Sequence, residues 1–167
     1  CIRDSHLLDL QTPDGGWGWF KGMYPSQEIT LYILKGMSQL TELNAVEYNQ
    51  QEKEMQMKAL KFVDKQIQSD YEALQKIKNW QKNEISPLEI EYLFVRSNYR
   101  DIPELGSARE AIRYYTNLAE KQWDKQSIHG KGEIAWLMWR NGNKEIAGKI
   151  ITWLRKTASI SPDKGMY

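Results

Sequence analysis

The stretch Gln-Thr-Pro-Asp-Gly-Gly-Trp-Gly-Trp-Phe, residues 11–20, combines turn residues with large aromatic side chains. Its Thr-Pro-Asp-Gly run predicts a tight turn, and the second glycine allows another backbone to approach closely. We expect the aromatic side chains to pack the turn onto neighbouring helix ends, so that the segment closes one helix and orients the next. The residues of this structural motif are Gln11, Asp14, Gly15, Gly16, Trp17, Trp19 and Phe20. A structural role is favoured over a catalytic one, because Asp14 is the single ionisable group and turn aspartates usually cap backbone N–H groups.

Downstream of this turn, the apolar residues recur with helical spacing. Between residues 29 and 43 they predict one stripe that packs against a core, formed by Ile29, Tyr32, Ile33, Met37, Leu40 and Leu43. The further helices are expected at 55–77, 86–98, 107–123, 128–140 and 144–158. Capping boxes at 86–89 and 107–110 mark two of the starts, and Asn-Gly-Asn at 141–143 indicates a tight reversal. Ser-Pro-Asp at 161–163 is expected to break or restart the chain.

No segment alternates apolar and polar residues as a half-buried strand would, so we expect no sheet. The fold class is therefore all-α, with antiparallel helix hairpins, and 1–167 is expected to form a single helical domain. Short connections favour hairpins that stack side by side or wrap into an α/α toroid-like arrangement. The seven tryptophans and nine tyrosines indicate an aromatic-rich core.

The composition excludes several classes of function. Lysine and arginine number 23 against 22 acidic residues, so no net field points to a nucleic acid or to an anionic membrane. No apolar run approaches the roughly 18 residues that a membrane span needs. Cys1 is the only cysteine, which excludes an internal disulfide and a cysteine-based metal cluster. Six lysines interspersed with Glu and Gln predict a solvated helix face, namely Lys58, Lys61, Lys65, Lys76, Lys78 and Lys82.

The remaining candidate residues favour structural roles. His6 and His129 are far apart in the sequence and lack the ligand spacing of a metal site, and we expect His129 to cap or pack a helix start. A catalytic pair of His129 with Asp124 is conceivable, but no nucleophile accompanies it. Gly-Lys-Gly at 130–132 is not a phosphate loop and fits close helix packing instead. We therefore predict no catalytic residue, no metal and no cofactor.

Three stretches together carry a resemblance to a known family. They are LLDLQTPDGGWGWFKGMYPSQEITLYILKGMSQL at 7–40, ISPLEIEYLFVRS at 85–97, and AEKQWDKQSIHGKGEIAWLMWRNGNKEIAGKIITWLRKTA at 119–158, with GMY at 165–167. In this order they resemble the thioester-type domain of bacterial alpha-2-macroglobulin family proteins, in particular the branch found in Bacteroides-like bacteria. The resemblance spans nearly the whole chain.

The resemblance implies an α/α toroid and a role as part of a protease inhibitor in the cell envelope, whether periplasmic or lipid-anchored, or secreted. In this family, cleavage of a bait region elsewhere in the molecule triggers collapse around the attacking protease. The implied partners are other domains of the parent protein and, through the parent, target proteases. Because a complete ring of this type needs about six hairpins and six helices make only three, we expect a fragment, about half a toroid.

The chain departs from the family in its reactive residues. The Cys-x-Glu-Gln thioester motif is missing, since Cys1 is followed by Ile-Arg-Asp. Complement-type relatives place a histidine soon after the Asp-Gly turn, whereas none lies between Gly15 and Leu40 here. No reactive residue is therefore carried over, and the chain is not expected to be an enzyme. Cys1 could be the lipid-bearing first residue of an envelope lipoprotein, but the lack of a flexible polar tether favours a simple cleavage point.

Two functional alternatives remain open, beside one further resemblance that does not transfer an activity. The Gln-x-x-Asp-Gly-Gly-Trp pattern also resembles the repeated motif of squalene-type cyclases, although the acidic protonation segment of those enzymes is missing. A toroid carbohydrate-active hydrolase or lyase would use paired carboxylates from Asp14, Glu28 and Glu89 near Trp17 and Trp19. The last alternative is a helical module that binds a protein partner through an exposed aromatic patch.

Overall fold

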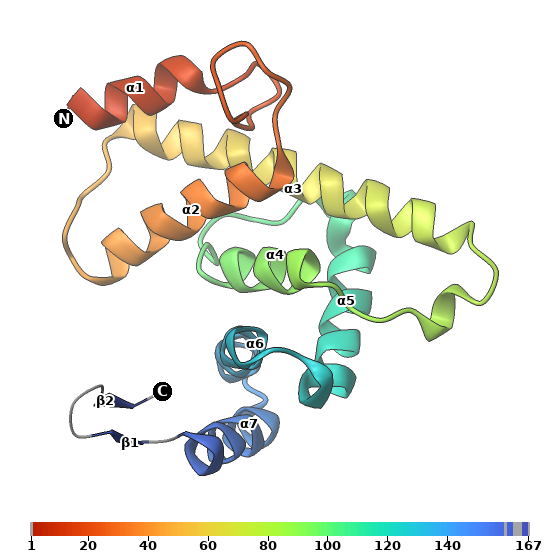
Figure 1. Cartoon of the computed structure of the whole chain (residues 1–167). Coiled ribbons are helices and arrows are strands. Elements are labelled where there is room, and N and C mark those ends of the chain that lie inside the picture. The colour runs from red at the N-terminus through yellow and green to blue at the C-terminus, as the bar shows by residue number, and fades with distance from the viewer. Residues whose placement is uncertain (1, 159, 162–164, 167) are drawn as a thin grey trace. The chain divides into compact units, whose positions relative to one another are not determined.

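The computed structural model describes residues 2–158, 160–161 and 165–166, and its described part contains seven α-helices (Figure 1). These helices are α1 (Ile2–Leu10), α2 (Gln27–Glu42), α3 (Gln50–Gln75), α4 (Pro87–Ser97), α5 (Arg109–Gln122), α6 (Ile128–Arg140) and α7 (Lys144–Thr157). Three short 3-10 helices lie between them, η1 (Trp80–Lys82), η2 (Gly106–Ala108) and η3 (Trp123–Lys125).

The fold is all-α, as predicted. One antiparallel pair of two-residue strands, β1 (Ile160–Ser161) and β2 (Gly165–Met166), departs from the expected absence of strands. The expected break at 161–163 falls partly outside the described residues.

The chain divides into two compact units. The first comprises residues 1–83 and 95–114, and the second comprises 84–94 and 115–167, so that α4 and α5 contribute residues to both. The single domain expected over 1–167 stays a prediction.

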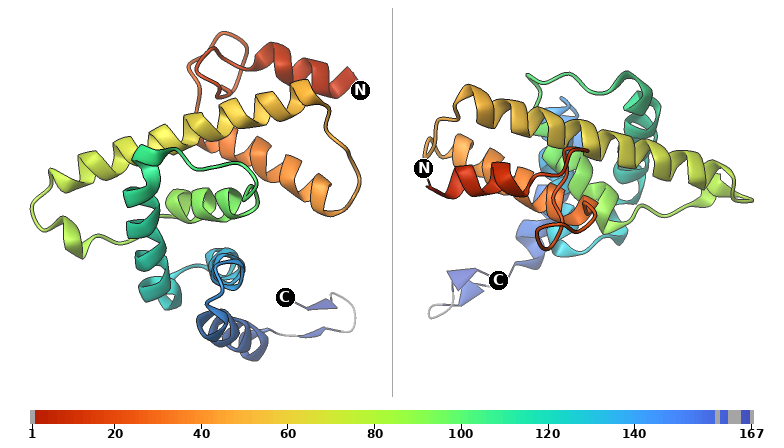
Figure 2. Two further views of the ribbon diagram at one scale, coloured as in Figure 1. Left: turned by 180° about the vertical axis from the view of Figure 1, so that it is seen from behind. Right: turned by 90° about the horizontal axis from the view of Figure 1, so that it is seen from above.

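The first unit is built around α3, the longest helix, against which α2 packs (Figures 1 and 2). Leu31, Leu34 and Met37 of α2 are buried, whereas Tyr32 is 72% exposed and Leu43 is 75% exposed. The predicted burial of the apolar stripe is therefore confirmed for Met37 and wrong for Tyr32 and Leu43. Apolar residues cover two faces of α2, and packing on α3 buries the face that carries Leu31 and Leu34.

The first turn of α3 begins earlier than the apolar pattern predicts. Asn49 accepts a hydrogen bond from the Glu52 backbone N–H at 3.0 Å, and the Glu52 carboxylate accepts one from the Asn49 N–H at 2.7 Å. This capping box stabilises a helix start in a polar stretch where no apolar residue marks the helix.

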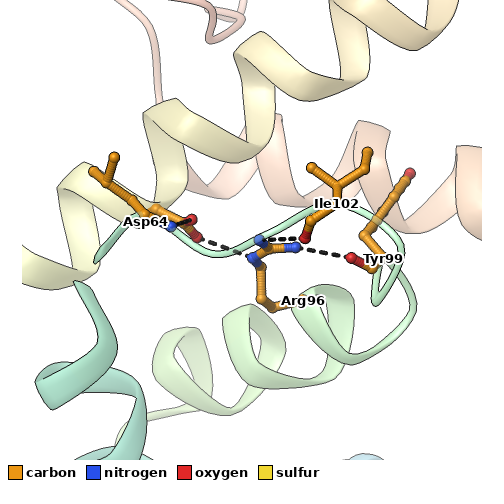
Figure 3. Close-up of polar contacts among 5 residues, drawn as sticks. Asp64, Arg96, Tyr99 and Ile102 are labelled. Carbon is orange, nitrogen blue, oxygen red and sulfur yellow. Dashed lines mark hydrogen bonds and ion pairs between the residues drawn. The ribbon is translucent and has the colours of Figure 1, made fainter. Parts of the chain in front are cut away.

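A buried ion pair holds the connection between α4 and α5 (Figure 3). Arg96 Nε lies 3.2 Å from Asp64 Oδ1, and the guanidinium also donates to the carbonyls of Tyr99 at 3.0 Å and Ile102 at 2.9 Å. The other Asp64 oxygen accepts from the Leu105 N–H at 2.9 Å, where η2 begins. The predicted helix cap at Ser107 is wrong, because that residue lies inside η2, which precedes α5, and the distant carboxylate of Asp64 binds the N–H of Leu105 just before η2.

In the second unit, α6 and α7 form a helix hairpin. Its reversal is as predicted, since Gly142 has φ +82° and the Asn143 side chain accepts from the Ile146 N–H at 3.2 Å. The hairpin buries a cluster of apolar side chains, Ile134, Leu137, Met138, Ala147 and Ile150. Lys131 is also buried, where its ammonium donates to the Gln126 carbonyl and lies 4.5 Å from the Trp153 ring centroid.

The start of α4 confirms its predicted capping signal. Pro87 is the first helical residue, and the Ser86 backbone N–H donates to the Glu89 carboxylate. Proline suits this position because its missing N–H would have had no helical partner. The boundaries predicted for α6 and α7 agree with the structure to within one residue.

Candidate functional site

The segment at 11–20 forms the expected tight turn. The Gly15 N–H donates to the Thr12 carbonyl at 2.9 Å, and Thr12 in turn donates to the Gly16 carbonyl through its N–H at 2.9 Å and its hydroxyl at 3.0 Å. Gly15 has φ +96°, a conformation that side chains with a Cβ rarely adopt. The turn is thus closed on itself by hydrogen bonds between its own residues.

The turn also packs directly on α3. The Gln11 amide donates to the Gly15 carbonyl at 2.8 Å and to the Met55 carbonyl at 2.9 Å, so that one side chain joins the turn to the helix. A Cβ on Gly15 would lie 2.5 Å from the Lys58 carbonyl oxygen, and one on Gly16 would lie 2.8 Å from the Phe62 ring. The predicted close backbone approach occurs at Gly15 and not at Gly16, where it was expected, because the atoms that crowd Gly16 belong to the side chains of Pro25 and Phe62.

Trp17 joins this turn to two further helices. It is 1% exposed, and its indole N–H donates to the Leu7 carbonyl of α1 at 2.9 Å. Its backbone N–H donates to the Thr30 hydroxyl of α2 at 3.0 Å, and its carbonyl accepts from the Ser26 N–H at 2.8 Å. The predicted packing role is therefore confirmed for Trp17.

The aromatic residues that follow Trp17 behave differently. Trp19 is 64% exposed and Phe20 is 76% exposed, so their predicted packing on helix ends is wrong. They belong to a loop at 18–24 that also exposes Met23 and Tyr24, and that is closed by a 3.1 Å bond from the Met23 N–H to the Phe20 carbonyl. We call residues 18–24 the aromatic loop. It projects large apolar side chains from a turn whose other half is buried.

The candidate carboxylates of the enzyme alternative have unequal surroundings. Asp14 and Glu28 are both exposed. Glu28 lies in the first turn of α2, where the helix dipole stabilises a negative charge. Glu89 accepts the hydrogen bond that caps α4. Glu28 and Glu89 thus each have a structural explanation, as a charge in the first turn of α2 and as the cap of α4. Within the described residues, no three His, Cys, Asp or Glu side chains gather in a way that could hold a metal ion.

The histidines do not take the predicted roles either. His129 is exposed and its Nε2 lies 3.1 Å from a Glu133 carboxylate oxygen, while Ser127 caps the helix start by accepting from the Gly130 N–H at 3.1 Å. The prediction that His129 caps or packs is therefore wrong. His6 and Asp124 are exposed. Gly130 is buried with Ile90 Cδ1 at 3.7 Å from the position of an added Cβ, so the predicted packing role holds there, whereas Gly132 is exposed.

Two features of the first unit were missed by sequence reasoning. The pairing of Asp64 with Arg96 had no local signal, because the two residues lie far apart in the sequence. The outer face of α2 was detectable, because that helix carries apolar residues at more positions than one face can bury. The structure shows a shallow hollow there, with a volume of about 370 Å³, that Leu7, Tyr32, Ile33 and Leu40 help to line. All six lysines of the predicted solvated face are exposed, but only Lys58, Lys61 and Lys65 share a helix, since Lys76, Lys78 and Lys82 lie after the end of α3.

None of the helices in the described part of the chain combines the length and the apolar character that a membrane span requires. No protein-family model, no curated protein sequence and no solved structure matches this chain.

Proposed function

We propose that this chain is a non-catalytic scaffold fragment of a bacterial alpha-2-macroglobulin-like endopeptidase inhibitor, in the arrangement of an incomplete α/α toroid. The proposal combines the sequence resemblance with one structural observation, the apolar side chains that the first unit leaves exposed. They include Trp19, Phe20, Met23 and Tyr24 of the aromatic loop, Tyr32 and Leu40 of α2, and Leu43 at the end of α2. A scaffold that docks onto other domains of its parent needs such surfaces.

The chemistry of these side chains fits a domain contact. Aromatic residues and methionine are enriched at the cores of protein interfaces, and the aromatic rings bury a large area with few rotatable bonds. Scattered apolar residues are common on protein surfaces, but a run of them on a seven-residue loop is not. The buried half of the turn fixes the base of this loop through Trp17 and Ser26. The loop is thus presented from a rigid support, which lowers the entropy that docking costs.

The parent protein tests this proposal directly. An antibody raised against this chain should detect a band several times larger than 20 kDa in the envelope or secreted fraction of the source cells. The purified parent, mixed with an endopeptidase, should then protect large protein substrates from cleavage while small chromogenic substrates are still hydrolysed. A cytoplasmic band near 20 kDa, or no protection of large substrates, would contradict the inhibitor function.

The aromatic loop also favours a second candidate, a helical module that binds a separate protein. The double substitution Phe20→Ser and Tyr24→Ser distinguishes the two. In the inhibitor it should reduce protease trapping through loss of a domain contact inside one polypeptide. In a binding module the variant should instead fail to capture a separate partner from the source cells, and the isolated parent should show no trapping with either sequence.

A further inference from the structure

The outer face of α2 carries a hollow of about 370 Å³. Leu7, Tyr32, Ile33 and Leu40 help to line it, and Lys35 is the only charged residue among its described lining residues. Since a cavity of roughly 150 Å³ already holds a benzene ring, this hollow has room for a large aromatic side chain. We call it the α2 hollow, and its chemistry favours an apolar occupant.

Gly36 of the α2 hollow is a second sign of an occupant. It lies in the interior of α2, where glycine is less favourable than any other residue except proline. A Cβ added to it would meet nothing within 4 Å, so packing inside the described chain does not require glycine at this position. A side chain of another molecule that packs on the α2 backbone would favour glycine there.

The aromatic loop has the matching chemistry. Phe20 is 76% exposed and Tyr24 is 95% exposed, and Lys21 is the only charged residue of the loop. The bond from the Ser26 N–H to the Trp17 carbonyl fixes the base of the loop, so little chain entropy is lost when it docks. An apolar projection and an apolar hollow are thus present on the same unit.

Leu7 shows that the two surfaces are neighbours. It helps to line the α2 hollow, and its carbonyl accepts the indole N–H of Trp17 at 2.9 Å, just before the aromatic loop. The loop then leads into the start of α2 (Figures 1 and 2). Two copies that meet through this region therefore bring each loop toward the hollow of the other.

The exposed area reaches that of a stable dimer only if the contact is made twice. Large aromatic side chains bury roughly 150 to 250 Å² each, so the three mostly exposed rings of the loop offer roughly 500 Å². A standard interface buries about 800 Å² per partner. One loop in one hollow falls short of this area, whereas a reciprocal pair, in which each copy supplies a loop and a hollow, reaches it.

We propose that the aromatic loop of one copy of this chain packs into the α2 hollow of a second copy, which returns the same contact. Phe20 packs over Gly36, and the contact is apolar because each surface carries a single charged residue. The inference concerns the chain by itself and does not rest on the proposed function. In a longer parent, a neighbouring domain would compete for the same two surfaces.

Sedimentation velocity of the full chain tests the proposal. We expect a reversible equilibrium between monomer and dimer, with a dissociation constant on the order of 10 to 100 µM, because the costs of association offset much of the gain from the buried area. Raising the salt to about 1 M should not weaken the dimer, since no ion pair holds it.

Two substitutions locate the contact. Phe20→Ser removes a ring from the loop, and Gly36→Gln fills the hollow with a polar side chain that is a better helix former than glycine. Each should raise the dissociation constant at least about tenfold, while the melting temperature stays at or above that of the unmodified chain. Ile128→Ser and Gly148→Gln are the matched controls, since Ile128 is 69% exposed and Gly148 is an exposed helical glycine outside the hollow. Neither control should change the dimer.

An equimolar mixture of the Phe20→Ser and Gly36→Gln chains tests the pairing of unlike surfaces. The first variant keeps an intact hollow and the second keeps an intact loop, so a mixed pair restores one complete contact. The mixture should therefore form more dimer than either variant alone at the same total concentration.

Three results would overturn the proposal. The first is a chain that stays monomeric up to about 1 mM, and the second is a dimer that both substitutions leave intact. The third is a mixture that forms no more dimer than the variants do separately, which would indicate that like surfaces pair instead. Dimerisation that is lost in both variants, kept in both controls and recovered in the mixture supports the assignment.

Discussion

Trp17 and Trp19 are separated by one glycine, yet the first is 1% exposed and the second is 64% exposed. Hydrogen bonds account for the difference. The indole and the backbone of Trp17 bond to α1, to α2 and to Ser26, so its ring is enclosed where three elements meet. Trp19 lies in the aromatic loop, which leads to α2 through Ser26 and leaves its large side chains exposed. Two halves of one aromatic segment thus serve opposite purposes, one holding the helices together and the other presenting a surface.

Glycines mark the same division. Gly15 and Gly22 both have positive φ, at +96° and +86°. An added Cβ on Gly15 would collide with the Lys58 carbonyl, whereas one on Gly22 would meet nothing within 4 Å. The buried half therefore restricts both backbone conformation and space, while the exposed half restricts backbone conformation alone.

The largest expected effect separates the two tryptophans. Trp17→Ala should lower the free energy of unfolding by about 3 to 5 kcal/mol, because it leaves a cavity and removes the bond to Leu7. Trp19→Ala, its matched control, should change that free energy by less than about 0.5 kcal/mol. Urea unfolding followed by circular dichroism measures both. A loss below about 1 kcal/mol for Trp17→Ala would show that the turn does not hold the helices together.

An intermediate effect is expected for the glycine pair. Gly15→Ala should destabilise the fold by about 2 to 3 kcal/mol, since it adds backbone strain to a collision with α3. Gly22→Ala should cost about 1 kcal/mol, the strain of the left-handed conformation alone. Thermal melting of the two variants beside the unmodified chain gives the difference. Equal losses would mean that the close approach to Lys58 relaxes without cost, and the comparison between the two halves would then rest on Trp17 alone.

Local signals predicted much of this fold, and long-range pairing accounts for what they missed. The bounds of α4, α6 and α7 followed from residues adjacent to the helix ends, such as Ser86 and Asn143. The Gly15 and Gly16 turn followed for the same reason. The start of α3 had a local signal too, in Asn49 and Glu52, but the apolar pattern pointed farther along the chain.

The burial of aromatic side chains could not be predicted in the same way. Composition shows that tryptophan and tyrosine are abundant, but burial depends on which elements come together in three dimensions. The buried face of α2 is decided by α3, and the N–H of Leu105, the residue before η2, is bonded by Asp64 from the middle of α3. The buried amide nitrogen of Gln56, which has no hydrogen-bond partner among the described residues, is likewise apparent only in the folded chain.

The smallest expected effect extends the comparison to two tyrosines of the first unit, Tyr99, which is buried, and Tyr24, which is 95% exposed. Burial raises the pKa of the Tyr99 hydroxyl above its ordinary value near 10, and the negative charges of Tyr48 and Asp101 act in the same direction. The protonated hydroxyl is therefore favoured in the folded state. Its contribution to stability is complete below about pH 10 and is lost as the pH rises further, because the unfolded chain releases this proton first.

Tyr99→Phe tests this sign. At neutral pH the variant should be less stable by about 1 kcal/mol, since the bond to the Leu34 carbonyl is lost. Between pH 9 and pH 11, however, its free energy of unfolding should fall by about 1 kcal/mol less than that of the unmodified chain, because the group that titrates has been removed. Tyr24→Phe removes a 95% exposed hydroxyl and is the control for the substitution itself; at neutral pH it should leave the free energy of unfolding unchanged within about 0.5 kcal/mol. If Tyr99→Phe followed the unmodified chain as the pH rises, the hydroxyl of Tyr99 would titrate equally in both states, and its enclosure between α2 and the loop after α4 would be looser than the hydrogen bond indicates.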